Sequence, residues 1–127
     1  MLLAVDHWAF MAAGIPKDRQ RQFDHLAEAQ ARLFAWSECK RFPLYRVEFS
    51  VPFVATDFSA HVLLFLKTDA QVRAESGARV PEAQAVFIRA LREAGYPEVH
   101  ILLVTFEADS DERVQRDYEG SYFYRMR

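Results

Sequence analysis

The sequence predicts an α+β fold in two layers, with helices packed on one face of a mixed or antiparallel sheet of about four strands. Apolar residues make up 51% of the 127 residues, which suffices for one core and leaves too little length for a second. Two segments carry apolar residues at helical spacing, and several short segments are rich in β-branched or aromatic residues. We expect a single domain over residues 1–127, ordered helix, strand, strand, helix, strand, short helix, strand.

The first amphipathic segment runs from Lys17 to about Arg41 and is expected to be a helix. Its apolar residues recur at intervals typical of one helix face. They are Phe23, Leu26, Ala27, Leu33, Phe34 and Trp36. No proline interrupts the segment between Pro16 and Pro43. The apolar residues 1–14 that precede it form a pattern that does not distinguish a strand from a helical turn.

Residues 45–51 and 61–67 are expected to be strands. The first segment alternates strictly, which predicts an antiparallel strand with one solvated face. Its apolar side chains are Tyr45, Val47, Phe49 and Val51, and its polar ones are Arg46, Glu48 and Ser50. Residues 61–67 are apolar on both faces, which is typical of a central strand.

The clearest helix covers residues 79–94. Pro81 suits its first turn, Gly95 suits a left-handed end, and Pro97 prevents continuation. Its apolar stripe consists of Ala83, Val86, Phe87, Ala90, Leu91 and Ala94.

The last part of the chain predicts three further elements. Residues 99–106 indicate a second central strand. The capping residues Ser110 and Glu112 predict a short helix that continues to Tyr118 and ends before Gly120. Residues 121–126 are expected to form the final strand, with Tyr122, Tyr124 and Met126 on one side.

Composition and charge disfavour several classes of protein. The net charge is −2, whereas a general nucleic-acid binder usually has a positive excess. The single cysteine, Cys39, allows neither an internal disulfide nor a thiolate zinc site. No apolar run approaches the roughly 18 residues of a membrane span. Asp6 interrupts the apolar start too early for a signal peptide. We expect a cytoplasmic protein without a membrane anchor.

No catalytic or cofactor motif is recognisable, so we expect no cofactor and favour a binding protein over an enzyme. The enzymatic alternative uses His61 and His100, which lie near the starts of two predicted strands. With a carboxylate they could hold a metal ion or transfer protons. A polar residue that meets water at the sheet edge is the simpler explanation of both histidines, since their spacing does not support a metal site.

The most distinctive feature is an acidic segment between Glu107 and Glu119. It holds six carboxylates and two arginines, which leaves a local charge of −4. Carboxylates at a helix start satisfy free N–H groups, and carboxylate oxygens are also ligands for Mg²⁺ or Ca²⁺. A third interpretation is a surface that docks a basic partner protein, as an inhibitor or immunity-type protein would. The residues expected to carry it are Asp109, Asp111, Glu112, Tyr118 and Tyr122.

A second surface lies between the two predicted strands, at residues 51–58. Val51, Phe53, Val54 and Phe58 make this connection unusually apolar for a loop. The N-terminal segment could cover it, or it could contact a partner or a second copy of the chain. Self-association is therefore the third functional hypothesis, after the binding protein and the enzyme. The sequence does not indicate whether a small-molecule ligand exists.

Overall fold

The structure, a computed structural model, describes residues 2–4 and 15–127 and contains one mixed sheet. Its strands are, in spatial order, β1 (Leu2–Ala4), β2 (Leu44–Pro52), β3 (Ala60–Leu66) and β4 (Val104–Ser110). Strands β1, β2 and β3 pair antiparallel, and β4 pairs parallel with β3. A parallel pair needs a crossover connection, and the helical segment between β3 and β4 supplies it.

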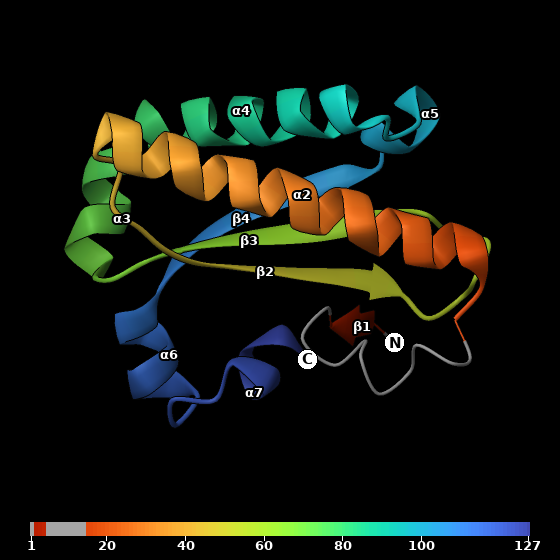
Figure 1. The fold of residues 1–127 in the computed structure, drawn as a ribbon. Helices are drawn as coiled ribbons and strands as arrows, with labels where there is room; N and C mark the ends of the chain where they lie inside the picture. The colour runs from red at the N-terminus through yellow and green to blue at the C-terminus, as the bar shows by residue number, and fades with distance from the viewer. Residues whose placement is uncertain (1, 5–14) are drawn as a thin grey trace.

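Two long helices cover one face of the sheet and lie side by side (Figure 1). They are α2 (Lys17–Lys40) and α4 (Arg79–Ala94), both close to the predicted helices. Shorter helices precede and follow α4, namely α3 (Asp69–Glu75) and α5 (Glu98–Ile101). The α+β class and the two-layer packing are therefore confirmed.

The main core lies between the sheet and these two helices. Strand β2 contributes Val47, Phe49 and Val51, three of the four apolar residues of its predicted alternation, whereas the fourth, Tyr45, is exposed. Phe23 and Phe87 reach the same core from α2 and α4 and are almost fully buried. At about 25 cal/mol per Å² of apolar surface, each such ring stabilises the fold by roughly 2–3 kcal/mol. Burial of the helix stripes thus holds both helices on the sheet.

The opposite face of the sheet carries two more short helices, which Figure 1 shows below the strands. They are α6 (Asp111–Asp117) and α7 (Tyr122–Met126). A small cluster of Leu63, Phe65, Val114, Tyr122 and Met126 packs there. This face is otherwise polar, and we call it the polar face. Its residues from the three long strands are Arg46, Glu48, Ser50, His61, Thr105, Glu107 and Asp109.

Two predicted strands need correction. Residues 99–106 do not form one strand, because Pro97 starts the short helix α5 and the strand begins only at Val104. Residues 122–126 are helical instead, and Ser121 caps this helix because its Oγ accepts a hydrogen bond from the Tyr124 backbone N–H. The solvated face predicted for β2 is also wrong in part, because Glu48 and Ser50 are buried. The prediction for residues 1–14 lies largely outside the described residues, which include only β1 from that segment.

Candidate functional site

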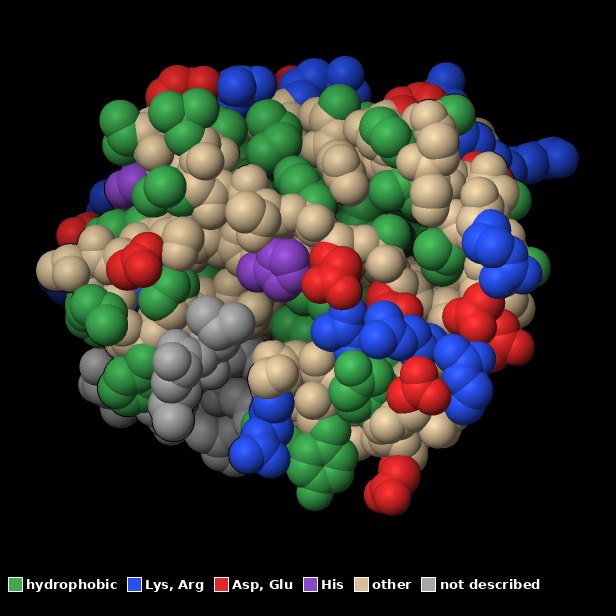
Figure 2. Space-filling model, turned by 180° about the vertical axis from the view of Figure 1, so that it is seen from behind, with side chains coloured by type: hydrophobic (Ala, Val, Ile, Leu, Met, Phe, Trp, Pro, Cys, Tyr) green, Lys and Arg blue, Asp and Glu red, His purple; other side chains and the backbone are tan. Residues whose placement is uncertain are grey.

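Asp109, one of the predicted docking residues, is buried on the polar face at the end of β4. Its carboxylate accepts a hydrogen bond from Arg125 at 2.6 Å and another from Arg113 at 3.3 Å. Arg125 also pairs with Glu107, and its side chain is only 11% exposed. Figure 2 shows a histidine, acidic side chains and a run of basic side chains in contact across this side of the molecule.

Asp111, the first residue of α6, has hydrogen bonds on both carboxylate oxygens. The Tyr122 hydroxyl donates to Oδ1 at 2.6 Å, and Lys67 Nζ donates to Oδ2 at 3.0 Å. The hydrogen bond from Tyr122, together with Lys67, holds the pKa of Asp111 below its usual range despite burial. Burial and the same carboxylate raise the pKa of Tyr122, so its hydroxyl remains a donor at neutral pH.

The other predicted docking residues belong to the same network. Glu112 accepts a hydrogen bond from the backbone N–H of Asp69 at 2.8 Å. The Tyr118 ring lies 5.8 Å from the Arg125 guanidinium carbon and 6.0 Å from that of Arg113. The structure thus brings the five residues together, but it uses Asp109, Asp111 and Tyr122 to fasten α6 and α7 to the sheet. Their role in docking stays a prediction.

The two histidines of the enzymatic hypothesis have different surroundings. His61 Nδ1 lies 2.7 Å from Thr105 Oγ1, and its Nε2 lies 3.1 Å from Glu107 Oε1. Burial favours a raised pKa for Glu107, but hydrogen bonds from His61 and Arg125 outweigh it and lower that pKa. His100 instead stacks on Phe58, with ring centroids 4.7 Å apart. Among the described residues, no group of three His, Cys, Asp or Glu side chains is placed to hold a metal ion.

Ser50, on the polar face of β2, is buried. Its hydroxyl is opposite His61 in the β2–β3 register, yet it makes no hydrogen bond to any described residue. An unsatisfied buried hydroxyl costs about 1–3 kcal/mol.

A different part of the molecule exposes apolar side chains. Among the described residues, five of the eight exposed large hydrophobic side chains belong to two segments, the loop after β2 and the region of α5. They are Phe53, Val54, Val99, Leu102 and Leu103, and we call this group the apolar end. Both segments flank the start of β3, because Pro52 ends β2 and the Ala60 N–H bonds to the Leu103 carbonyl. They therefore lie at the same end of the sheet, on either side of β3.

The loop of the apolar end is held in place by Arg19, a buried residue of α2. Its Nη2 donates to the carbonyl oxygens of Pro52, Val54 and Asp57, at distances of 3.2, 2.8 and 2.8 Å. Burial lowers the pKa of Arg19, although the Asp57 charge opposes this. Since the backbone is fastened in this way, Phe53 and Val54 are presented to solvent by an anchored loop.

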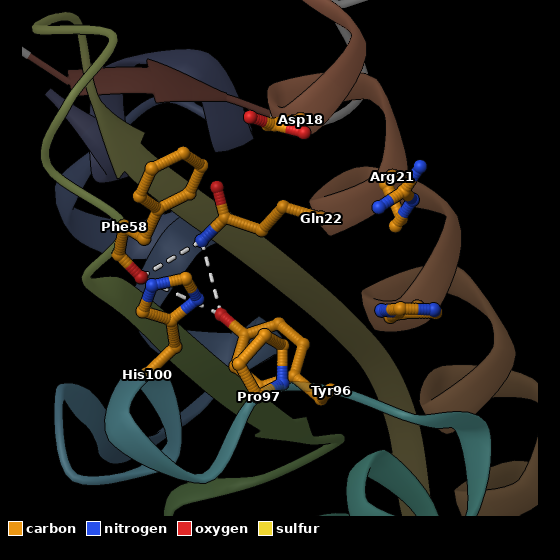
Figure 3. A pocket seen from close by; sticks show the side chains of 8 residues that line it. Asp18, Arg21, Gln22, Phe58, Tyr96, Pro97 and His100 are labelled. Carbon is orange, nitrogen blue, oxygen red and sulfur yellow. Dashed lines mark hydrogen bonds between the residues drawn. The ribbon is translucent and has the colours of Figure 1, made fainter.

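A pocket of about 130 Å³ opens between α2, this loop and α5. Its lining residues are Asp18, Arg21, Gln22, His25, Phe58, Tyr96, Pro97 and His100. Figure 3 shows Gln22 reaching from α2 toward Phe58 and Tyr96. The Gln22 amide donates to the Phe58 carbonyl at 2.9 Å and to the Tyr96 hydroxyl at 3.0 Å. Burial raises the pKa of Tyr96, so this floor is uncharged at neutral pH.

The sequence contained partial signals for this pocket. Asp18, Arg21 and His25 are spaced by three and four residues and therefore share one face of the first predicted helix. Nothing in the sequence relates that face to Phe58 or to Tyr96, because the three segments meet only in the folded chain.

The helix α3 also had a signal in the sequence, since Thr68 and Gln71 form a capping box.

Comparisons of this chain with protein-family models, with curated proteins and with solved structures find no match. In the part of the chain that the structure describes, no helix has both the length and the apolar character needed to cross a membrane.

Proposed function

We propose that this chain is a binding protein that docks a partner protein through the apolar end. The observation that carries the proposal is the exposure of Val99 on α5 and of Leu102 directly after it, which are 68% and 85% exposed. Exposed apolar side chains grouped in this way are typical of protein interaction sites. The neighbouring charged residues Asp57, Arg92 and Glu98 supply the polar rim that such sites usually have.

The choice of the apolar end over the acidic segment rests on which side chains already have partners within the chain. The acidic residues Asp109 and Asp111 are paired inside the fold, so they contribute little to attraction at a distance. The side chains of the apolar end are between 45% and 85% exposed, and covering them with a partner removes apolar surface from water. We therefore expect the apolar end to contribute more free energy to docking than the acidic segment.

An acidic surface for a basic partner is the second candidate. It is favoured by the exposed carboxylates Glu112, Asp117 and Glu119 on and after α6, together with the net charge of −2. Arg113 and Arg116 offset part of this charge by pairing with Asp117. Binding at this surface would weaken as salt rises.

A quantitative capture experiment distinguishes these surfaces. The tagged chain is compared with a Val99→Ser/Leu102→Ser variant and with a Phe123→Ser/Tyr124→Ser variant. The second variant is the matched control, because its two aromatic residues are 47% and 52% exposed but lie on α7. Our proposal expects a stoichiometric partner that is kept by the control, lost with the α5 variant, and retained at about 0.5 M salt, where charge attraction is screened.

Three outcomes would contradict the proposal. The first is capture that the α5 substitutions leave unchanged. The second is capture that disappears at high salt and with Glu112→Gln, which would assign docking to the acidic surface. The third is a dimeric mass in solution that becomes monomeric in the α5 variant, which would show that a second copy covers the apolar end.

A further inference from the structure

The pocket beside the apolar end has the size of a single six-membered ring. Its volume is about 130 Å³. An engineered cavity of about 150 Å³ lined by apolar side chains binds benzene. A ligand that enters this pocket therefore places one ring inside and leaves any larger or charged group at the opening.

The inside of the pocket suits an aromatic ring. Phe58 and His100 are stacked with an interplanar angle of 15°, and the Tyr96 ring lies edge-on to His100 at 6.1 Å. The polar groups of the floor are already paired, because the Gln22 amide bonds to the Tyr96 hydroxyl. A ring packed there gains contact with aromatic faces and edges, and it leaves the hydrogen bond between the Gln22 amide and the Tyr96 hydroxyl intact.

The opening of the pocket carries two opposite charges. Asp18 and Arg21 are exposed and line the pocket from α2. Among the described residues, neither has an ion pair or a side-chain hydrogen bond. Residues three apart on a helix have Cβ atoms about 5–6 Å apart. That spacing suits an ammonium group and a carboxylate carried on one carbon atom, with each group next to the opposite charge.

We propose that this pocket binds a small aromatic zwitterion of the class of the free aromatic amino acids. The ring lies against Phe58 and Tyr96, the carboxylate faces Arg21, and the ammonium group faces Asp18. The inference does not depend on the docking of a partner protein at the apolar end.

Calorimetric titration of the purified chain tests the proposal with three related compounds. L-phenylalanine carries both charges, phenethylamine lacks the carboxylate, and 3-phenylpropionate lacks the ammonium group. An exposed ion pair contributes up to about fivefold in affinity. We expect L-phenylalanine to bind about threefold to fivefold more tightly than either single-charge compound.

Two substitutions assign the charges. Arg21→Gln should remove the preference over phenethylamine, and Asp18→Asn should remove the preference over 3-phenylpropionate. Arg32→Gln is the matched control, since Arg32 lies on the same helix outside the pocket and is 45% exposed. The proposal is overturned if no compound binds at about 10 mM, which corresponds to less than about 3 kcal/mol of binding free energy. It is also overturned if all three compounds bind equally, or if Arg21→Gln has no more effect than Arg32→Gln.

The test separates this inference from the proposed function. It uses the isolated chain, so it gives a result whether or not a partner protein exists. The Val99→Ser/Leu102→Ser variant should bind L-phenylalanine with unchanged affinity, because neither residue lines the pocket. Loss of L-phenylalanine binding in that variant would contradict the pocket that we describe.

Discussion

The polar face and the apolar end differ in how far the fold buries and pairs their side chains. On the polar face, Asp109 and Asp111 are buried and each is bonded to at least two side chains. At the apolar end, Leu102 is 85% exposed. The number of charges in a segment therefore says little about which surface is open to a partner. A surface is open to a partner when its side chains have not already found contacts within the fold.

The two regions also differ in what holds them. The polar face depends on charged hydrogen bonds that link α6 and α7 to the sheet, where breaking one partner leaves another charge buried. The apolar end depends on backbone carbonyls held by Arg19, and its side chains contribute little to the fold. Substitutions should therefore change stability on the polar face and binding at the apolar end.

The largest expected effect is on the polar face. Replacing Arg125 with Met keeps an unbranched stem but removes the closest cation from Asp109 and the arginine partner of Glu107. Asp109 would stay buried with the Ser110 backbone N–H on one oxygen and only the longer contact to Arg113 as a cation, so we expect the free energy of unfolding to fall by about 3 kcal/mol. Urea-induced unfolding measures the change.

Arg127→Met is the control for this substitution. Arg127 is exposed at the end of the same helix, and its guanidinium carbon lies 5.7 Å from the centre of the Phe123 ring. An exposed cation–π contact contributes less than about 1 kcal/mol. Equal losses for the two variants would show that the charged network on the polar face does not stabilise the fold.

The second effect concerns the anchor of the apolar end. Arg19→Met removes the donor to three loop carbonyls and should lower the free energy of unfolding by about 2 kcal/mol, because those oxygens regain bonds to water only in part. Faster amide hydrogen exchange confined to residues 53–59 would accompany the loss. Gln20→Met, one residue along α2 with an exposed hydrogen bond to Asp24, is the control. A loop that exchanges no faster than in the control would contradict the anchoring role.

Much of the fold could be predicted from sequence because burial imposes a period. The stripe from Ala83 to Leu91 and the alternation from Val47 to Val51 each place one set of side chains in the main core. The strand predicted for residues 121–126 was wrong. Tyr122 and Tyr124 alternate as in a strand, but the buried pair is Tyr122 and Met126, which lie one helical turn apart. The hydrogen bond that caps the helix at Ser121 favours the helix over the strand in this segment.

The site could be predicted less well than the fold. The acidic residues lie near one another in the fold, yet their partners Lys67 and Arg125 lie up to 44 residues away in sequence, and no local pattern shows that they pair. The predicted central strand over 99–106 assumed that its apolar residues are buried. Val99 and Leu102 are instead exposed, because Pro97 turns this stretch into a helix at the end of the sheet.

A smaller effect is expected from Tyr122→Phe, which removes the hydroxyl bonded to Asp111. A hydrogen bond to a charged group contributes about 1.5 kcal/mol, and Lys67 remains to pair with the carboxylate. The pKa of folded Asp111 is lowered, so its contribution is present above the unfolded pKa of about 3.9 and is lost as pH falls through the folded pKa. The difference in stability between wild type and Tyr122→Phe should therefore be full at pH 7 and shrink below about pH 4. If the difference in stability stayed constant to about pH 2.5, the protonation of Asp111 would not be coupled to its hydrogen bond with Tyr122.

The smallest effect on stability is expected where the largest effect on binding is proposed. Val99→Ser/Leu102→Ser should change the free energy of unfolding by less than about 0.5 kcal/mol, because both side chains are mostly exposed in the folded chain. Leu63→Ser, at a buried position of β3, gives the contrasting case, with a loss of at least about 3 kcal/mol. If urea unfolding showed a loss above about 1 kcal/mol for the α5 variant, these side chains would stabilise the fold, and reduced partner capture could no longer be assigned to a docking surface. A variant as stable as wild type that fails to capture the partner would instead separate binding from folding at this end of the molecule.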